Sequence, residues 1–284
     1  MASLSGDEFK SYFEREQLPK FSCGFRAIDR VSGGGLRVGD MSIIGASTGH
    51  GKSAFAEQIA LNMSRDTTVL FLPLEMGAAD TWTRMAVKVE RRAKATGLYA
   101  VSTPGKAASG TVTELNNRSL RVYQPTTMPI FTVQDLMHLM ADAGCKIVIV
   151  DHVRHITGWL MDGAKATHVG PSIILQQLQH AARELEIHVM LCAQLNRGGY
   201  KGKPELAHLQ DTSSLEQLAT QVFLLHRPFI KVAGHDNVME ISVAKNRAGP
   251  TCLLHYHWDG PTMMLMPMTD EEEAAVTCCD RIAK

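Results

Sequence analysis

Short apolar runs alternate with longer segments of helical periodicity along most of this chain. Such runs are typical of strands that are buried on both faces of a parallel sheet. They predict strands at Met41–Ile44, Val69–Leu72, Lys146–Val150, His188–Ala193 and Gln221–Leu225. The segments between them predict helices at Ser53–Ser64, Ala79–Ala95, Thr132–Ala143 and Ser172–Leu185. This order indicates an α/β fold in which helices flank a mainly parallel sheet.

The pattern changes after Arg227. Three strand-like runs follow with turn residues and no helical segment between them: Val238–Lys245, Thr251–Trp258 and Thr262–Met266. Consecutive strands that are joined by tight turns predict an antiparallel hairpin extension at the C-terminal side of the sheet.

The two ends of the chain differ from this central region. In residues 7–18, apolar side chains recur at nearly helical spacing until Pro19 ends the pattern. This short amphipathic helix either packs on its own subunit or docks as an arm on a neighbouring one. We expect an N-terminal arm at 1–20, one domain at 21–268 and a polar, frayed tail at 269–284.

Three further segments, 96–117, 158–171 and 197–214, have the composition of long surface loops. Long loops in a compact α/β domain are usually functional or disordered. The second and third follow the carboxyl ends of predicted strands, where open parallel sheets bind their ligands.

Composition narrows the class of protein. Of the 284 residues, 45% are hydrophobic and 20% are charged, as in a globular domain. Lys+Arg and Asp+Glu are equal at 29 each, so no overall charge attracts a polyanion, although a few basic loops could still bind nucleic acid. The six cysteines lack metal-binding spacings, and no run has the length of a signal peptide or a membrane span. A cytoplasmic protein is expected.

The stretch Met41–Ser53, MSIIGASTGHGKS, combines a strand, a loop of small residues and a Lys-Ser pair that opens a helix. In this order, backbone N–H groups and the helix N-terminus can surround phosphate oxygens. Lys52 would reach the β- and γ-phosphates of a nucleotide, and Ser53 would bind Mg²⁺. Ala46 replaces the first glycine of the strict pattern and is small enough for the turn. The expected nucleotide-binding residues are Ala46, Ser47, Thr48, Gly49, His50, Gly51, Lys52 and Ser53.

Polar residues at the ends of neighbouring strands would complete such a site. Asp151 ends the run KIVIVD, where a carboxylate would orient Mg²⁺. Glu75 ends VLFLPLE and fits either a general base for the attacking water or a carboxylate that stabilises a helix N-terminus. Gln194 follows HVMLCA and is either a γ-phosphate sensor or a loop amide that bonds its own backbone.

Lys245 and Arg247 lie at the predicted tip of the C-terminal hairpin. Residues at i and i+2 of a strand point to the same face. Two cations there suit an arginine finger that stabilises charge on a γ-phosphate, and a solvated turn is the alternative. Histidine pairs such as His152 and His155 lack a third ligand at a recognisable spacing, so no zinc site is expected.

Several motifs together resemble the RecA-like motor domain of DnaB-type replicative helicases. In the order of that family, the chain carries AxxxxGKS, LPLEM, IVIVDH, AQLNR, SSLEQLA and AKNRAGP, and GFRAIDRVSGGGLRVGD precedes them. The resemblance covers roughly residues 21 to 266. It implies a RecA-like P-loop ATPase fold and a ring, usually of six subunits. Such a ring hydrolyses ATP with Mg²⁺, translocates on single-stranded DNA and unwinds duplex.

The resemblance also implies roles for five residues of the nucleotide site. Lys52 binds phosphate, Ser53 and Asp151 hold Mg²⁺, Glu75 is the catalytic base and Gln194 is the sensor.

Four further expectations follow from it for residues outside that group. Lys245 and Arg247 reach into the site of the adjacent subunit, and Arg227 joins the nucleotide site. Arg197 opens a loop that faces the central channel. Phosphates of one DNA strand are expected to bind the basic residues of this loop and of the one before it, namely Arg197, Lys201, Lys203 and Lys165.

The chain departs from the pattern of that family in three places. His152 stands where a tyrosine is usual, and SSLEQLATQ lacks the usual glycine and second aspartate, which makes a third DNA-facing loop a weaker expectation. Only some twenty residues precede the motor, whereas the bacterial family carries a helical primase-binding domain there. A ring of phage or plasmid type is therefore expected, with a primase or a helicase loader as a further candidate partner.

Two other functions compete with the helicase. A RecA/RadA-type recombinase or recombination mediator would use ATP to gate its affinity for DNA, but AKNRAGP on a C-terminal hairpin favours the helicase. A regulatory ATP-binding assembly would bind no DNA, and the basic loop RGGYKGKP argues against it.

Overall fold

The computed structural model describes residues 18–94, 109–123, 133–156, 171–200, 202–209, 212–230, 237–269 and 271. Parallel strands form the centre of the structure: β3 (Met41–Ala46), β4 (Val69–Pro73), β5 (Leu120–Val122), β6 (Ile147–Asp151), β7 (His188–Gln194) and β8 (Gln221–His226). Antiparallel strands follow them: β9 (Val238–Asn246), β10 (Cys252–Asp259) and β11 (Met264–Pro267).

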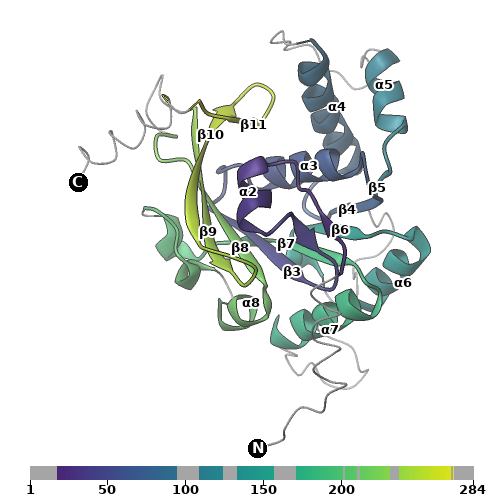
Figure 1. Ribbon diagram of the computed structural model, residues 1–284, viewed down its shortest axis with the longest axis vertical. Coiled ribbons are helices and arrows are strands. Elements are labelled where there is room, and N and C mark those ends of the chain that lie inside the picture. Colours follow the sequence, from purple (N-terminus) through teal and green to yellow (C-terminus); the bar gives the residue numbers. More distant parts are fainter. Residues whose placement is uncertain are drawn as a thin grey trace, which may run out of the picture.

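Within the described ranges, these nine strands form one sheet in the order β11-β10-β9-β8-β3-β7-β6-β4-β5 (Figure 1). The central strand β3 pairs in parallel with β7 on one side and β8 on the other. A small second sheet pairs β1 (Lys20–Phe21) with β2 (Leu36–Arg37). The predicted fold class is confirmed: a mainly parallel sheet is flanked by helices and ends in an antiparallel hairpin extension.

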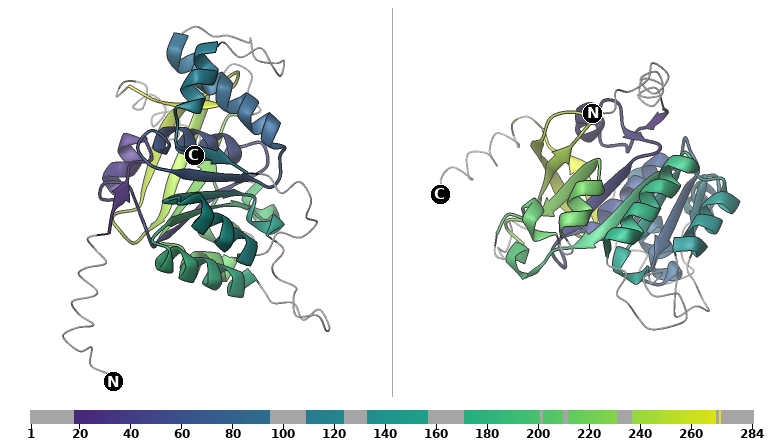
Figure 2. Two further views of the ribbon diagram at one scale, coloured as in Figure 1. Left: turned by 90° about the vertical axis from the view of Figure 1, so that its right-hand side faces the viewer. Right: turned by 90° about the horizontal axis from the view of Figure 1, so that it is seen from below.

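Two layers of helices cover the two faces of this sheet (Figures 1 and 2). One core contains residues of α2 (Arg26–Val31), α3 (Lys52–Met63), α4 (Ala78–Lys94) and α5 (Ser109–Asn116). The other contains residues of α6 (Val133–Ala143), α7 (Pro171–Glu184) and α8 (Thr212–Leu218). Successive strand residues alternate between these cores, so Ile43 packs in the second and Ile44 in the first. Both residues are fully buried, which explains why the strands read as continuous apolar runs.

The carboxyl ends of the parallel strands gather the residues that the sequence singles out. β3 leads into the phosphate loop, β6 ends at Asp151 and β7 at Gln194, while Glu75 follows β4 after one intervening residue. Leu74 and Glu75 both donate backbone N–H groups to the carbonyl of Asp151, which ties the end of β4 to the end of β6. The fold thus brings four distant segments of the sequence to one edge of the sheet.

Two of the three predicted loops contain regular structure and are corrected here. The segment 96–117 includes α5, which packs Leu115 into the core although the helix is too short to show a clear periodicity. The segment 197–214 includes 3₁₀ helices at Arg197–Tyr200 and Leu206–His208 and the start of α8, and an isolated bridge between Leu195 and Leu209 closes its base.

Most of the remaining terminal and loop expectations fall outside the described residues. These are the N-terminal arm up to residue 17, nearly all of the loop 158–171 and most of the C-terminal tail. In the part of the chain that is described, no helix has both the length and the apolar composition that crossing a bilayer requires.

Candidate nucleotide site

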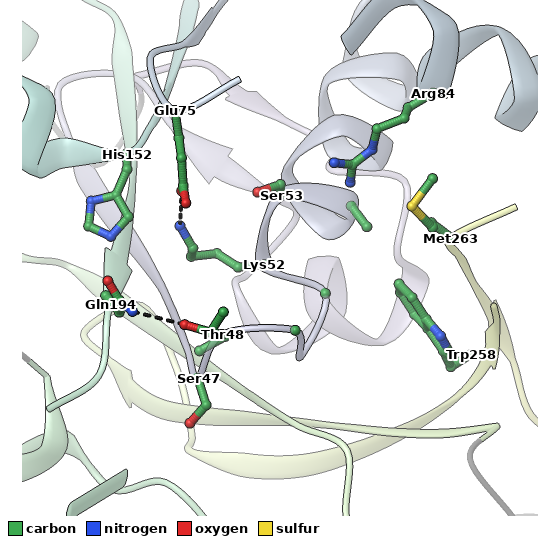
Figure 3. A pocket seen from close by; sticks show the side chains of 14 residues that line it. Ser47, Thr48, Lys52, Ser53, Glu75, Arg84, His152, Gln194, Trp258 and Met263 are labelled. Atoms are coloured by element: carbon green, nitrogen blue, oxygen red, sulfur yellow. Dashed lines mark hydrogen bonds and ion pairs between the residues drawn. The ribbon is translucent and has the colours of Figure 1, made fainter. Parts of the chain in front are cut away.

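A cavity of about 270 Å³ opens between the phosphate loop, the ends of β4, β6 and β7, and the C-terminal hairpin (Figure 3). Its lining comes from segments that are far apart in the sequence: Ala46, Ser47, Thr48, Gly49, Gly51, Lys52, Ser53, Ala54, Glu75, Arg84, His152, Gln194, Trp258 and Met263. The structure therefore brings together most of the residues that the sequence assigns to nucleotide binding.

The phosphate loop is shaped by its last glycine. Gly51 is the N-cap of α3 and has a φ of 86°, in the left-handed region that favours glycine. A Cβ atom at this position would lie 2.9 Å from the ring of Trp258. The first turn of α3 thus begins directly at the cavity, where its backbone N–H groups and dipole favour an anion.

Lys52 is the cation of the cavity that pairs with two carboxylates. Its Nζ lies 3.8 Å from Oε2 of Glu75 (Figure 3) and 3.1 Å from Oδ1 of Asp151. Burial alone would lower the pKa of this ammonium, but Cys192, Asp151 and Glu75 raise it, and the net pKa lies above its ordinary 10.5. Lys52 therefore stays charged at neutral pH and can exchange its carboxylate partners for phosphate oxygens.

The candidate Mg²⁺ ligands are hard oxygen donors, which suit this ion. The Asp151 side chain is only 4% exposed and contacts Lys52, and Ser53 lines the cavity at the first turn of α3. Glu75 differs, because its side chain is 56% exposed and can meet water. Gln194 donates from Nε2 to the hydroxyl of Thr48 at 2.9 Å, which joins this amide to the phosphate loop.

The sequence does not assign five of the lining residues to this site: Ala54, Arg84, His152, Trp258 and Met263. Arg84 of α4 reaches the cavity while its Nε lies 3.1 Å from Oε1 of Glu57, a buried carboxylate of α3 that also contacts Nζ of Lys88 at 2.5 Å. Trp258 and Met263 enter from the hairpin (Figure 3). From the sequence pattern, Trp258 is expected to be an ordinary core residue of a strand. No local sequence feature distinguishes Arg84 from the other cations of its helix.

Arg227 lies beside the cavity rather than in its lining. Its guanidinium is 4.8 Å from the ring centroid of Trp258, in the geometry of a cation–π contact. Its backbone N–H donates to Nδ1 of His50 at 3.0 Å. Arg227 thus supports both the aromatic wall of the cavity and the phosphate loop.

A family model described as the DnaB-like helicase C terminal domain matches residues 21–266, most of the chain. This chain belongs to that family. It is 28% identical over 240 residues to the replicative DNA helicase DnaC of Bacillus subtilis (strain 168), a match that covers 80% of this chain and 52% of the relative. It is 29% identical over 241 residues to the replicative DNA helicase DnaB of Leifsonia xyli subsp. xyli, with coverage of 80% and 51%. The chain spans about half the length of these relatives.

Solved structures agree with this DnaB-like assignment at the level of the fold. One solved ATPase domain superimposes with a TM-score of 0.76 at 24% identity, covering 94% of this chain and all of that domain. A DnaB-like replicative helicase, solved in work on its interactions with primase, gives a TM-score of 0.76 at 23% identity, with coverage of 95% and 68%.

The two hairpin cations of this DnaB-like domain lie away from its own cavity. Lys245 donates to the carbonyls of Glu216 and Gln217, and Arg247 donates to the carbonyl of Gln217 at 2.7 Å. Both therefore contact the C-terminal end of α8, where cations are favoured by the helix dipole. Neither is among the described residues that line the cavity.

The DNA-binding candidates of the DnaB-like domain are only partly described. Arg197 begins a 3₁₀ helix, and Lys203 follows on the exposed part of the same loop. The side chain of Lys203 is 48% exposed, and its Nζ lies 3.4 Å from Oε2 of Glu240. Lys165 and Lys201 fall outside the described residues.

Proposed function

We propose that this chain is the motor of an ATP-dependent replicative DNA helicase that moves along single-stranded DNA and unwinds duplex. The observation that carries the proposal is the convergence of Glu75 and the buried Asp151 on Lys52, which lines the cavity at the start of α3. In a DnaB-like family member, this arrangement supports the binding and hydrolysis of a nucleoside triphosphate.

Five polar residues in and beside the cavity have distinct tasks in this proposal. Lys52 leaves its carboxylate partners and binds the β- and γ-phosphates. Ser53 and Asp151 hold Mg²⁺, which neutralises charge on the phosphate oxygens when it is bound. Glu75 accepts a proton from the attacking water, and its exposure gives water access to its oxygens. Gln194 senses the γ-phosphate through its bond to the phosphate loop.

The other end of the cavity suits the base of the nucleotide. Trp258 and Met263 present an apolar wall there, and Arg227 packs on the indole ring. Stacking on such a wall tolerates any base, so the proposal is ATP or another nucleoside triphosphate.

A complete site requires a second copy of the chain in this proposal. Lys245 and Arg247 are held together at the end of β9, away from their own cavity, which supports a role in the cavity of a neighbour. Repetition of one such contact closes a ring. A hexamer is the proposed assembly, with DNA phosphates bound by Arg197, Lys201, Lys203 and Lys165.

The proposal also includes a partner protein and a cellular location. A primase or a helicase loader is a candidate partner. The support for a primase is that one structural neighbour, a DnaB-like replicative helicase, was described together with its interactions with primase. The cytoplasm of a bacterial or phage-infected cell is the expected location.

Hydrolysis of ATP by the purified chain tests this function. We expect single-stranded DNA to stimulate hydrolysis and a forked duplex to be opened, and Lys52→Ala to abolish both activities. Lys146→Ala is the matched control, because that lysine is partly exposed and lies beside Glu186, just before β6 and thus at the opposite end of the parallel strands. A wild-type chain that hydrolyses ATP but neither binds single strands nor opens a fork would exclude the helicase.

A further inference from the structure

Glu240 is a buried carboxylate that lies between two histidines on neighbouring strands. In the sheet register it is paired with His226 of β8 on one side and His255 of β10 on the other. Directly opposed residues of antiparallel strands place their side chains on the same face. The Glu240 side chain is 4% exposed, and Nε2 of His255 lies 3.8 Å from its Oε1. Lys203, from the loop between β7 and α8, approaches its other oxygen at 3.4 Å.

Glu240, His226, His255 and Lys203 form one charged cluster. Within this cluster, Lys203 is the group that can leave its partner. Burial alone would raise the pKa of Glu240, but His255, Lys203 and His226 lower it, and the net pKa lies below its ordinary 4.5. Glu240 is therefore an anion at neutral pH and is fixed within the sheet. Lys203 is half-exposed on a loop, so its ammonium can exchange this anion for another one that arrives from solvent.

The same cluster continues to the phosphate loop. The ring of His226 stacks on the ring of His50, with centroids 5.6 Å apart and an angle of 17° between the planes. A second contact reaches the phosphate loop directly from the loop that carries Lys203, because the hydroxyl of Ser47 donates to the carbonyl of Gly199 at 3.1 Å. The Lys203 loop is thus connected to the phosphate loop both directly and by way of Glu240 and His226.

We propose that Glu240 is a positioning residue that holds Lys203 until a phosphate of single-stranded DNA takes it, and that His226 conveys this exchange to His50 in the phosphate loop. The proposal rests on the proposed helicase function. In this proposal, Glu240 couples DNA binding to the nucleotide site. His226 faces the carboxylate of Glu240, and its ring stacks on His50 of the phosphate loop.

The affinity for an oligo-dT strand tests the first half of this proposal. Glu240→Gln removes the anion that competes for Lys203, so we expect binding to tighten by up to about fivefold, the value of a partly exposed ion pair. Lys203→Ala should weaken binding and lower the salt slope by about 0.7. The double variant should match Lys203→Ala, because it has no ammonium to release. Glu240→Asp, which withdraws the carboxylate but keeps its charge, should tighten binding less than Glu240→Gln does.

The stimulation of hydrolysis by DNA tests the second half. His226→Phe keeps a ring against His50 but loses the imidazole that faces Glu240. We expect it to bind oligo-dT as the wild type does and to show a smaller ratio of DNA-stimulated to DNA-free hydrolysis. A ratio equal to that of the wild type would overturn the transmission through His226.

The outcomes separate this inference from the function on which it rests. A wild-type chain that fails to bind oligo-dT contradicts the helicase proposal itself. A wild-type chain that binds, while folded Glu240→Gln and Glu240→Asp bind no tighter, overturns the role of Glu240. A merely structural glutamate would instead give weaker DNA binding and a lower melting temperature in both variants. Should Glu240→Gln fail to fold, the comparison of Glu240→Asp with the wild type decides the question alone.

Discussion

His50 is an imidazole of the phosphate loop that the surrounding groups keep neutral. Its Nδ1 accepts the backbone N–H of Arg227 at 3.0 Å, so its own proton is on Nε2. Partial burial and the neighbouring charges of His226 and Arg227 lower the pKa of His50 from 6.5 to about 4. A neutral ring can stack closely on His226, whereas a charged one would repel the guanidinium beside it.

The stability of the domain should depend on this histidine in mildly acidic solution. Unfolded His50 takes up a proton near pH 6.5 and the folded residue only near pH 4, so its contribution is lost as the pH falls from about 6.5 through about 4. Because the ring is half-exposed, we expect at most about 1 kcal/mol from it. His50→Phe should therefore lose less stability over this range, as measured by thermal unfolding at a series of pH values. An equal loss in both proteins would contradict this.

At the scale of elements, the start of α3 is held by a strand that lies some two hundred residues further along the chain. Trp258 of β10 packs against the backbone of Gly51, so closely that a side chain there would collide with its ring. The hairpin extension is therefore part of the nucleotide site as well as the support of Lys245 and Arg247.

Gly51→Ala should damage both the fold and the site. The positive φ alone costs about 1–2 kcal/mol for alanine, and the contact with Trp258 adds to it. We expect a lower melting temperature and the loss of nucleotide binding, measured by calorimetry with ATP. Gly110→Ala in α5 is the matched control, because no atom lies within 4 Å of its Cβ position, and alanine should stabilise that helix by about 0.5–1 kcal/mol. Equal effects of the two substitutions would show that Trp258 does not constrain the loop.

The elements also show where sequence patterns suffice and where they do not. The parallel strands of the sheet centre are predicted closely, because Val69–Pro73 and the strands beside it are buried on both faces and form apolar runs. The helix α2 and the strand β5 were missed, since six and three residues are too few to show a period. Lys52 and Asp151 were predicted from local motifs. Arg84 and Trp258 depend on tertiary packing that no local pattern encodes.

At the scale of the whole molecule, the groups proposed for catalysis occupy two separate surfaces. Glu75 and Lys52 lie in the cavity, whereas Arg247 is bonded to the end of α8. Residues 1–17 of the N-terminal arm, which either packs on its own subunit or docks on a neighbour, lie outside the described residues, so the arrangement of the cations is the structural argument for assembly.

Mixing two inactive variants tests this arrangement. Arg247→Ala should prevent turnover while leaving nucleotide binding intact, and Glu75→Ala should lack the catalytic base. If Arg247 acts in the cavity of a neighbour, mixed assemblies contain some interfaces with an intact pair, and hydrolysis of ATP should partly recover. Each variant alone is the control, and an absence of recovery on mixing would favour action within one subunit.

The position of Lys245 and Arg247 on the end of α8 also affects how much ATP the unassembled protein would consume in the cell. If the two cations act in the cavity of a neighbour, as proposed, an isolated subunit keeps the residues that bind a nucleotide but lacks the cations that complete its site for hydrolysis. Its rate of hydrolysis would then depend on how crowded the subunits are, rising steeply once they meet. Dilution would therefore stop ATP hydrolysis without any inhibitor. Subunits that are not yet assembled would consume almost no ATP.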